Sequence, residues 1–316
     1  MTDYNDVLSR IQSIYKLSSE HDREILLKIL EEIHENGDSK TYENIWLQDY
    51  KEIPVDIETF LSDELFLGKA TNNGKSVYPH WKDVLNDIFV ERNECNEIVL
   101  TGATRIGKTS TAITGAAYML YQLMCLRDPQ KFFDKKEVSK FSILFFNLTK
   151  DLAKGVAFRE FNDTLQVSPW FNEHGTFSRS DDNFYYIPEG GKVVIDYGSN
   201  AAHSLGKQVY CGLMDEINFS RAGVKDVNKA KAHMQELYTT VADRIKGTFR
   251  MGGRVYGKLF AISSKRSDSD FMEAYVDRQR RAGADEFMYI DDKPQWEVLP
   301  KGTFHNETFY IAVGDR

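Results

Sequence analysis

Glu97-Ile-Val-Leu-Thr-Gly-Ala-Thr-Arg-Ile-Gly-Lys-Thr-Ser-Thr111 is the stretch that decides the fold. Its apolar, β-branched start at 98–100 predicts a buried strand, and residues 110–123 predict a helix rich in Ala, Leu and Met. Between them, Gly102-Ala-Thr-Arg-Ile-Gly-Lys-Thr109 matches G-x-x-x-x-G-K-[ST] at every fixed position. Glycines let such a loop curl so that its N–H groups point at phosphate oxygens, and the helix N-terminus adds partial positive charge there. The sequence therefore predicts a site for a nucleoside triphosphate.

Within this loop, Lys108 is expected to reach the β- and γ-phosphates and the Thr109 hydroxyl to bind Mg²⁺. Arg105 stands where a guanidinium can stabilise transition-state charge, the alternative being a solvent-facing loop arginine. Upstream, Tyr78 and Trp81 can flank an adenine ring, and packing in the core is the equal alternative. The expected nucleotide-binding residues are Gly102, Ala103, Thr104, Arg105, Ile106, Gly107, Lys108, Thr109, Ser110, Tyr78 and Trp81.

A second stretch, Val209-Tyr-Cys-Gly-Leu-Met-Asp-Glu216, is a mostly apolar strand that ends in two acids. Where such a strand follows a complete phosphate loop, the first acid typically holds Mg²⁺ and the second activates the attacking water. Asp215 is therefore predicted to bind the metal and Glu216 to act as the general base. The chain has no Asn-Lys-x-Asp guanine signature, which favours ATP over GTP.

Composition narrows the class of protein. The hydrophobic and charged fractions, 41% and 28%, are those of an ordinary globular chain. No apolar run approaches the roughly 20 residues that span a bilayer, and the acidic, polar N-terminus does not resemble a secretory signal. Cys95, Cys125 and Cys211 form no C-x-x-C pair, so we expect buried, reduced thiols.

The order of elements predicts an α/β P-loop NTPase fold of the ASCE type, with a mostly parallel sheet covered by helices on both faces. Further strands are expected at 141–146, 184–187, 192–197, 209–214 and 258–263, with a helix at 149–165. Residues 5–36 are expected to be helical, with Gly37 as the stop. We expect a small helical N-terminal subdomain at 1–60, the ATPase domain at 61–290 and an extension at 291–316.

With these pieces placed, residues 97–280 resemble the ATPase domain of the large terminase subunit of tailed bacteriophages, the DNA-packaging motor. The resemblance rests on the Arg-bearing loop Ala103-Thr-Arg-Ile-Gly-Lys-Thr109 and on Tyr197-Gly-Ser-Asn-Ala-Ala-His-Ser-Leu-Gly206. It also rests on Leu213-Met-Asp-Glu-Ile-Asn-Phe219, and on Leu259-Phe-Ala-Ile-Ser-Ser264 followed by Asp270-Phe-Met-Glu-Ala-Tyr275.

The resemblance implies that Ser263 or Ser264 senses the γ-phosphate and relays hydrolysis to movement, the alternative being a serine that caps the next helix. It implies double-stranded DNA, the portal protein and the small terminase subunit as partners. The chain would be a monomer in isolation, a homo-oligomeric ring on the procapsid, and located in the host cytoplasm away from membranes. Large terminases normally carry a C-terminal nuclease, and too few residues follow about residue 290 to hold one, so no nuclease activity is expected.

Residues 221–258 are basic in an acidic chain. They hold nine Lys or Arg against three Asp or Glu, whereas the whole chain has a net charge of −8. Such a segment suits sequence-neutral contact with DNA phosphates, and a solvated surface is the alternative. The candidates for DNA contact, or for an arginine finger in a neighbouring subunit, are Arg244, Lys246, Arg250 and Arg254.

These expectations combine into an ATP-hydrolysing, Mg²⁺-dependent motor that moves double-stranded DNA into a procapsid. Another nucleic-acid translocase or a helicase is the first rival, and strand unwinding would distinguish it. A P-loop phosphotransferase predicts a small-molecule acceptor and no stimulation by DNA. A nucleotide-gated assembly module predicts ATP binding without turnover.

Overall fold

The computed structural model describes residues 20–37, 49–179, 183–186, 192–218, 227–251, 253–265, 270–283 and 285–304. The chain forms two compact units, Met1–Ile53 and Pro54–Arg316. Helix α2 (Glu20–Asn36) belongs to the first unit and covers the second half of the helix expected at 5–36, whose first half lies outside the described residues. Gly37 follows with φ of 75° and donates its N–H to the carbonyl of Ile33, a C-terminal stop of the kind that glycine permits.

An eight-stranded sheet organises the second unit, with the strand order β10-β1-β9-β6-β2-β5-β4-β3. The six strands from β10 to β5 run parallel, while β4 and β3 are antiparallel to their neighbours. The strands are β1 (Glu97–Gly102), β2 (Phe141–Phe146), β3 (Thr176–Arg179), β4 (Asn183–Tyr186), β5 (Lys192–Gly198), β6 (Gln208–Met214), β9 (Lys258–Ile262) and β10 (Met288–Lys293). A separate hairpin pairs β7 (Arg250–Met251) with β8 (Arg254–Val255).

The expected α/β fold with a mostly parallel sheet is confirmed. β9 is inserted between β1, which leads into the phosphate loop, and β6, which ends in the two acids. That inserted strand is the arrangement that the ASCE type requires. Because the central strands are parallel, their carboxyl ends meet at one edge of the sheet, where ligands of open α/β sheets bind.

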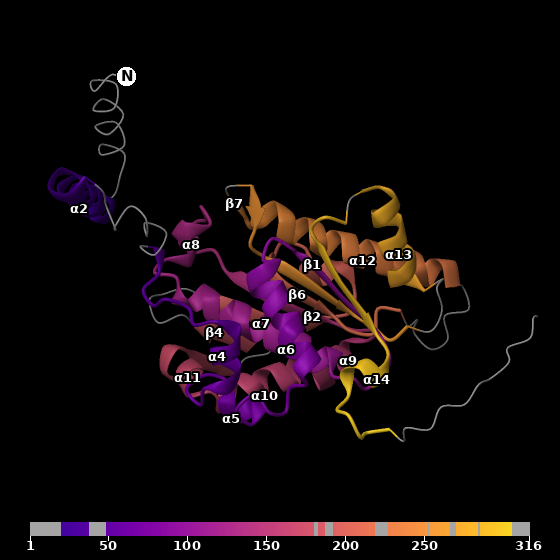
Figure 1. Ribbon diagram of the computed structural model, residues 1–316. Helices are drawn as coiled ribbons and strands as arrows, with labels where there is room; N and C mark the ends of the chain where they lie inside the picture. Colours follow the sequence, from indigo (N-terminus) through magenta and orange to yellow (C-terminus); the bar gives the residue numbers. More distant parts are fainter. Residues whose placement is uncertain are drawn as a thin grey trace, which may run out of the picture. The chain divides into compact units, whose positions relative to one another are not determined.

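Helices cover both faces of the sheet (Figure 1). On one face, α7 (Lys108–Cys125) packs so closely that a Cβ at Gly115 would lie 2.7 Å from the ring of Phe260. On the other, α12 (Val227–Thr248) approaches Gly212, where a Cβ would meet Leu259 at 2.9 Å and Val241 at 3.0 Å. Leu259 and Phe260 are consecutive strand residues, so their side chains point to opposite faces and fix the two helical layers.

The remaining helices complete these layers (Figure 1). They are α4 (Ile57–Ser62), α5 (Gly68–Thr71), α6 (Pro79–Asn86), α8 (Pro129–Phe132), α9 (Lys150–Ala153), α10 (Arg159–Val167), α11 (Pro169–His174), α13 (Phe271–Arg281) and α14 (Gln295–Val298). Two π-helical segments, η2 (Asp87–Glu91) and η3 (Lys154–Phe158), and a 3₁₀ turn, η4 (Ala201–Ser204), link them. The helix expected at 149–165 is thus a run of α9, η3 and α10, capped where the Thr149 hydroxyl accepts the N–H of Leu152.

The boundaries of the second unit differ from those expected from the sequence. It begins at Pro54 rather than after residue 60, because Phe60 is fully buried against the rings of Phe66, Tyr118 and Tyr121. At the other end, residue 290 falls inside β10, an outer strand of the sheet. Residues 305–316 of the expected extension lie outside the described residues.

Candidate nucleotide-binding site

The loop between β1 and α7 has the backbone that its glycines predict. Gly102 and Gly107 both have φ of 95°, a left-handed conformation that L-residues avoid. A Cβ at Gly102 would also lie 2.7 Å from the backbone N of Lys293, and one at Gly107 would lie 3.1 Å from the indole Nε1 of Trp81. Both positions therefore need glycine for conformation and for space. Helix α7 begins at Lys108, so its N-terminus adjoins the loop.

Lys108 is 5% exposed, and its Nζ donates a hydrogen bond to the carbonyl of Ala103. Burial lowers the pKa of this amine, while the carboxylates of Glu216, Asp215, Asp292 and Asp291 act in the opposite direction. The ammonium is therefore held inside the loop, among acids that come from two different strands. A phosphate that displaces the Ala103 carbonyl would find the cation already in place.

The predicted acids lie beside the loop. The Thr109 hydroxyl lies 3.3 Å from Asp215 Oδ1, which also accepts the backbone N–H of Glu216 at 3.1 Å. Burial, with a further contribution from the charge of Glu216, raises the pKa of Asp215 to about 6. The fold thus brings together two motifs separated by about a hundred residues of sequence.

Thr109 and Asp215 fit the expected Mg²⁺. Both supply oxygen, and two neighbouring ligands of an octahedral Mg²⁺ lie about 3 Å apart, close to the observed 3.3 Å. Nucleotide phosphates and water typically complete such a site. Within the described ranges, no group of three or more His, Cys, Asp or Glu forms a metal cluster of its own.

Two predicted catalytic residues have strained backbones. Arg105 and Glu216 have φ of 58° and 59°, the left-handed region that residues with long side chains rarely occupy. Such strain costs about 1–3 kcal/mol and typically clusters at functional sites. Arg105 is exposed at the tip of the loop, and Glu216 is partly exposed at the end of β6. Ser110 is exposed too, and its hydroxyl donates to Glu160 on α10 at 2.7 Å.

Of the two expected adenine-flanking residues, Trp81 has another position. It is 1% exposed, and its indole N–H donates to the carbonyl of Ile106, so it supports the loop from beneath and has no free face for a base. Tyr78 is partly exposed and lies against Gly107, within reach of the loop surface. The structure therefore corrects the interpretation of Trp81 and leaves Tyr78 as a prediction.

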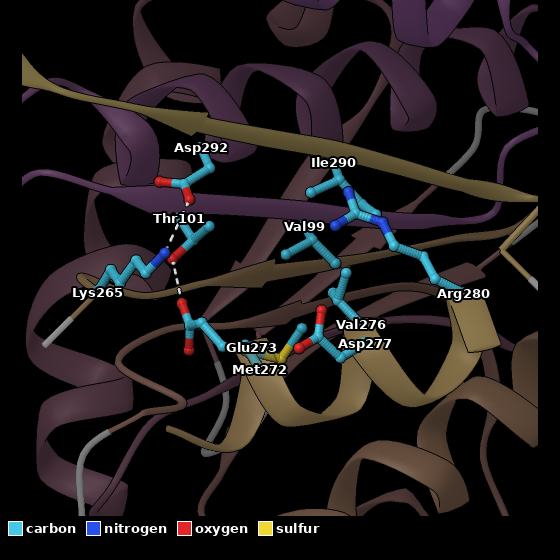
Figure 2. Close-up of a pocket in the computed structure, with 10 residues that line it drawn as sticks. All are labelled: Val99, Thr101, Lys265, Met272, Glu273, Val276, Asp277, Arg280, Ile290 and Asp292. Atoms are coloured by element: carbon cyan, nitrogen blue, oxygen red, sulfur yellow. Dashed lines mark hydrogen bonds and ion pairs between the residues drawn. The ribbon is translucent and has the colours of Figure 1, made fainter. Parts of the chain in front are cut away.

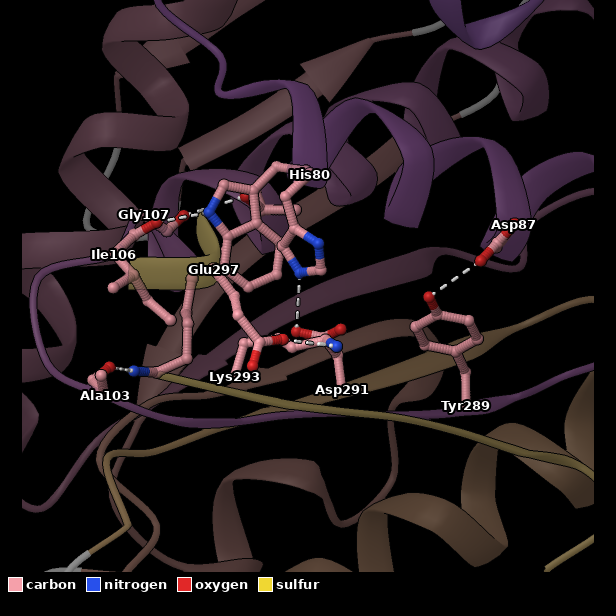
Figure 3. A network of polar contacts seen from close by, with 12 residues as sticks. His80, Asp87, Ala103, Ile106, Gly107, Tyr289, Asp291, Lys293 and Glu297 are labelled. Atoms are coloured by element: carbon pink, nitrogen blue, oxygen red, sulfur yellow. Dashed lines mark hydrogen bonds and ion pairs between the residues drawn. The ribbon is translucent and has the colours of Figure 1, made fainter. Parts of the chain in front are cut away.

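The C-terminal strand forms a second wall that the sequence interpretation missed. The carbonyl of Lys293 accepts the N–H of Ala103 at 3.0 Å, and Gln295 donates to the carbonyl of Thr104 at 2.9 Å. Asp291 is buried, and His80 Nε2 lies 3.0 Å from its Oδ2 (Figure 3). A signal existed, because Met288-Tyr-Ile-Asp-Asp292 is an apolar strand that ends in two acids, as 209–216 is.

Ser263 and Ser264, the predicted coupling residues, follow β9. This strand lies between β1, which leads into the phosphate loop, and β6, which leads into the two acids. Both are buried, at 2% and 7% exposure. The Ser263 hydroxyl accepts the backbone N–H of Asn218 at 3.0 Å, and the Ser264 carbonyl accepts from the Asn218 amide at 3.4 Å. The structure thus places them beside residues 215–218, the acidic turn that follows β6, and their role in coupling stays a prediction.

The four basic candidates lie at the opposite, amino-terminal edge of the sheet. Lys246 pairs with Glu97 at the start of β1, and Arg244 donates to the carbonyl of Lys207, which precedes β6. Because Lys246 and Arg244 make contacts within the chain, they are less available to a partner than the sequence suggests. Arg250 and Arg254 are exposed on the β7–β8 hairpin.

All three cysteines are buried and reduced, as expected. Across the described part of the chain, no helix is long and apolar enough to cross a bilayer.

Some solved structures are similar to the chain at low identity. The large terminase of bacteriophage HK97 has a TM-score of 0.42 and 16% identity, over 68% of this chain and 38% of that one. The large terminase of the thermophilic bacteriophage D6E, in complex with ATP-gamma-S, has a TM-score of 0.43 and 11% identity, over 71% and 47%. The ATPase domain of the Thermus phage P74-26 large terminase has a TM-score of 0.27 and 11% identity, over 64% and 89%. The chain thus spans less than half the length of the first two.

Among curated proteins, no match was found. One family model covers nearly the whole chain, residues 11–311, and its description is "Uncharacterized protein MJ0330, N-terminal P-loop domain". That domain description agrees with the strand, glycine loop and helix seen at 97–125. The chain belongs to this family of P-loop domains.

Proposed function

We propose that this chain is a Mg²⁺-dependent ATPase that converts hydrolysis into movement along double-stranded DNA. The observation that supports this proposal most directly is that Thr109 and Asp215 lie 3.3 Å apart at the carboxyl edge of the sheet. Lys108 lies inside the same loop and Glu216 follows Asp215 directly. These are a phosphate-binding cation, two Mg²⁺-binding oxygens and a carboxylate placed to activate water.

The proposed mechanism assigns each group a task. The loop N–H groups and Lys108 bind the phosphates, and Thr109 and Asp215 would hold a Mg²⁺ ion, which would supply positive charge to offset that of the phosphates. Glu216 accepts a proton from the attacking water. Arg105 offsets charge that develops on the γ-phosphate. The chemistry needs no covalent intermediate on the protein.

DNA as the polymer is the finer part of the proposal. It is supported by the four motif resemblances and by the basic segment 221–258, of which Arg250 and Arg254 are exposed. β1 is six residues long, so the two edges of the sheet are about 20 Å apart. Arg250 and Arg254 would therefore serve the ATP site only of a neighbouring copy in a ring.

Glu216→Gln tests the ATPase. We expect this variant to bind ATP with unchanged Kd and to lose at least about a hundredfold in kcat, because the amide cannot accept the proton. Lys108→Ala should lose ATP binding itself. Glu236→Gln, on an exposed residue of α12, is the matched control and should behave as the wild type.

The same assay, with and without duplex DNA at low and high salt, tests the motor. Stimulation by DNA that disappears at high salt, and that weakens in Arg250→Ala with Arg254→Ala, supports phosphate contacts. Wild-type turnover that is unchanged in Glu216→Gln would contradict the assignment of the base. Turnover without any response to DNA at low salt would contradict the motor.

A further inference from the structure

One side chain of α13 connects the two halves of the nucleotide site. Glu273 Oε1 accepts the hydroxyl of Thr101 at 2.9 Å, and its Oε2 accepts the amide N–H of Asn218 at 3.0 Å. Asn218 also accepts the backbone N–H of Met272 at 2.9 Å and donates its own N–H to Ser263 at 3.0 Å. Thr101 and Asn218 are 5% and 7% exposed. Buried hydrogen bonds to a carboxylate are stronger and more directional than exposed ones.

The positions of these residues in the chain show that the hydrogen bonds join the phosphate loop to the acidic turn. Thr101 directly precedes Gly102, where the phosphate loop begins. Asn218 follows Glu216 by two residues, and Ser263 follows the last residue of β9. A shift of either the loop or the acidic turn therefore pulls on Glu273 and, through it, on α13.

A small cavity gives α13 room to respond. Its volume is about 150 Å³, and it lies between α13 and the strands β1 and β10 (Figure 2). Met272 and Val276 of the helix face Val99 and Ile290 of the sheet across it. Protein interiors are otherwise close-packed, so a helix moves most readily where contacts with its neighbour are incomplete.

We propose that Glu273 is a positioning residue that holds the phosphate loop and the acidic turn in register, and that α13 follows the state of the nucleotide through it. The inference rests on the proposed ATPase function. It adds Thr101, Asn218 and Glu273 to the residues on which turnover depends, although none of them is assigned a contact with the nucleotide. It also makes α13 the element that carries the movement onward.

Two pairs of changes test the bridge that Glu273 forms between Thr101 and Asn218. Thr101→Val removes the hydroxyl and keeps the shape of the side chain, whereas Thr101→Ser keeps the hydroxyl. Glu273→Ala removes the bridge, whereas Glu273→Gln can restore it, since its carbonyl accepts from Asn218 and its amide donates to the Thr101 hydroxyl. Arg281→Lys, at the exposed end of α13 and outside the cavity lining, is the control on the same helix.

Four quantities are measured for each variant: the melting temperature, Kd for ATP-gamma-S, kcat for ATP, and hydrogen exchange of α13 amides with and without ATP-gamma-S. We expect Thr101→Val and Glu273→Ala to lose about tenfold in kcat, with Kd changed less than about threefold. In the wild type, the nucleotide should change exchange in α13, and these two variants should lose that response. Thr101→Ser, Glu273→Gln and Arg281→Lys should retain both.

The outcomes separate this inference from the proposed function. If the wild type binds no nucleotide, both fail. If the wild type hydrolyses ATP while folded Thr101→Val matches it in kcat and in the exchange of α13, only the inference fails. If these residues served stability alone, the variants would have a lower melting temperature, while the kcat of the folded fraction and the exchange response of α13 would be unchanged. This result would also overturn the inference.

Discussion

Single residues in this chain show how the phosphate loop is held from outside itself. The indole of Trp81 donates to the carbonyl of Ile106, and a Cβ on Gly107 would lie 3.1 Å from the indole nitrogen. Trp81 lies on α6, upstream of the strand that enters the loop. A residue that looks like a base-stacking aromatic in the sequence is therefore part of the loop's support.

Trp81→Phe tests this support. The change removes the only polar atom of the side chain and leaves the Ile106 carbonyl without that donor. We expect the free energy of unfolding to fall by about 2 kcal/mol and ATP affinity to fall about three- to tenfold. Urea unfolding and a binding titration measure the two effects.

Trp170→Phe is the matched control for this change. Trp170 is also 1% exposed but packs against Tyr121, in the aromatic cluster around Phe60. It should lose stability and keep its affinity for ATP. Equal losses of affinity in the two variants would contradict a specific role for Trp81.

At the scale of elements, the sequence was most informative where a pattern is local. Residues 141–146 form a strand as expected, because six consecutive buried residues read as an interior strand of a parallel sheet. β10 was missed, although it has the same apolar run and acidic end as β6. Its place beside β1 depends on pairing across about 190 residues, which no local pattern encodes. The hydrogen bonds of Glu273 with Thr101 and Asn218 could not be predicted from the sequence for the same reason.

The first residue of β9 carries a buried cation that makes folding depend on pH. Lys258 is 4% exposed, and its Nζ donates to the carbonyls of Asn93 and Cys95. Burial, with a smaller contribution from Arg254, lowers the pKa of Lys258 to about 8. Between pH 8 and the ordinary lysine value, the unfolded chain holds a proton that the folded chain has released. The free energy of unfolding therefore rises with pH in this window, by about 3 kcal/mol across all of it.

Lys258→Met removes this titration. Unfolding by urea at pH 7.5 and at pH 9.5 should show the wild type gaining about 2 kcal/mol relative to the variant at the higher pH. The comparison cancels the hydrogen bonds that the variant loses at both pH values. Lys69→Met, at an exposed lysine, should keep a constant difference from the wild type. A difference for Lys258→Met that stays constant as well would show that its amine titrates normally.

For the molecule as a whole, the parallel sheet carries two different groups of polar residues at its two edges. Its carboxyl edge gathers the phosphate loop, the two acids and β10. At its amino edge, Glu97 binds Lys246 and accepts hydrogen bonds from the hydroxyls of Tyr238 and Tyr275. Burial raises the pKa of Tyr275 far above its usual range, so its hydroxyl stays protonated as a donor. β1 therefore begins in a cluster that ties α12 and α13 together and ends in the nucleotide site.

The division of the chain at Pro54 leads to the last prediction. A chain of residues 54–316 keeps Val55, whose N–H donates to the Tyr121 hydroxyl at 2.9 Å and whose carbonyl accepts from Tyr118 at 2.7 Å. It also keeps Phe60. A chain of residues 61–316, cut where the sequence placed the boundary, loses all of these contacts. Truncating a buried phenylalanine alone costs about 3–5 kcal/mol, a large part of the stability of an ordinary domain.

We expect the 54–316 chain to unfold cooperatively. Its melting temperature should lie within a few degrees of that of the second unit in the full chain, and its Kd for ATP-gamma-S should be unchanged. The 61–316 chain should melt far lower or fail to fold. Differential scanning calorimetry and a nucleotide titration on both chains decide the matter. Equal stability of the two would mean that the aromatic cluster around Phe60 contributes little and that the sequence-derived boundary was adequate. Loss of nucleotide binding in a folded 54–316 chain would contradict the assignment of the whole site to the second unit.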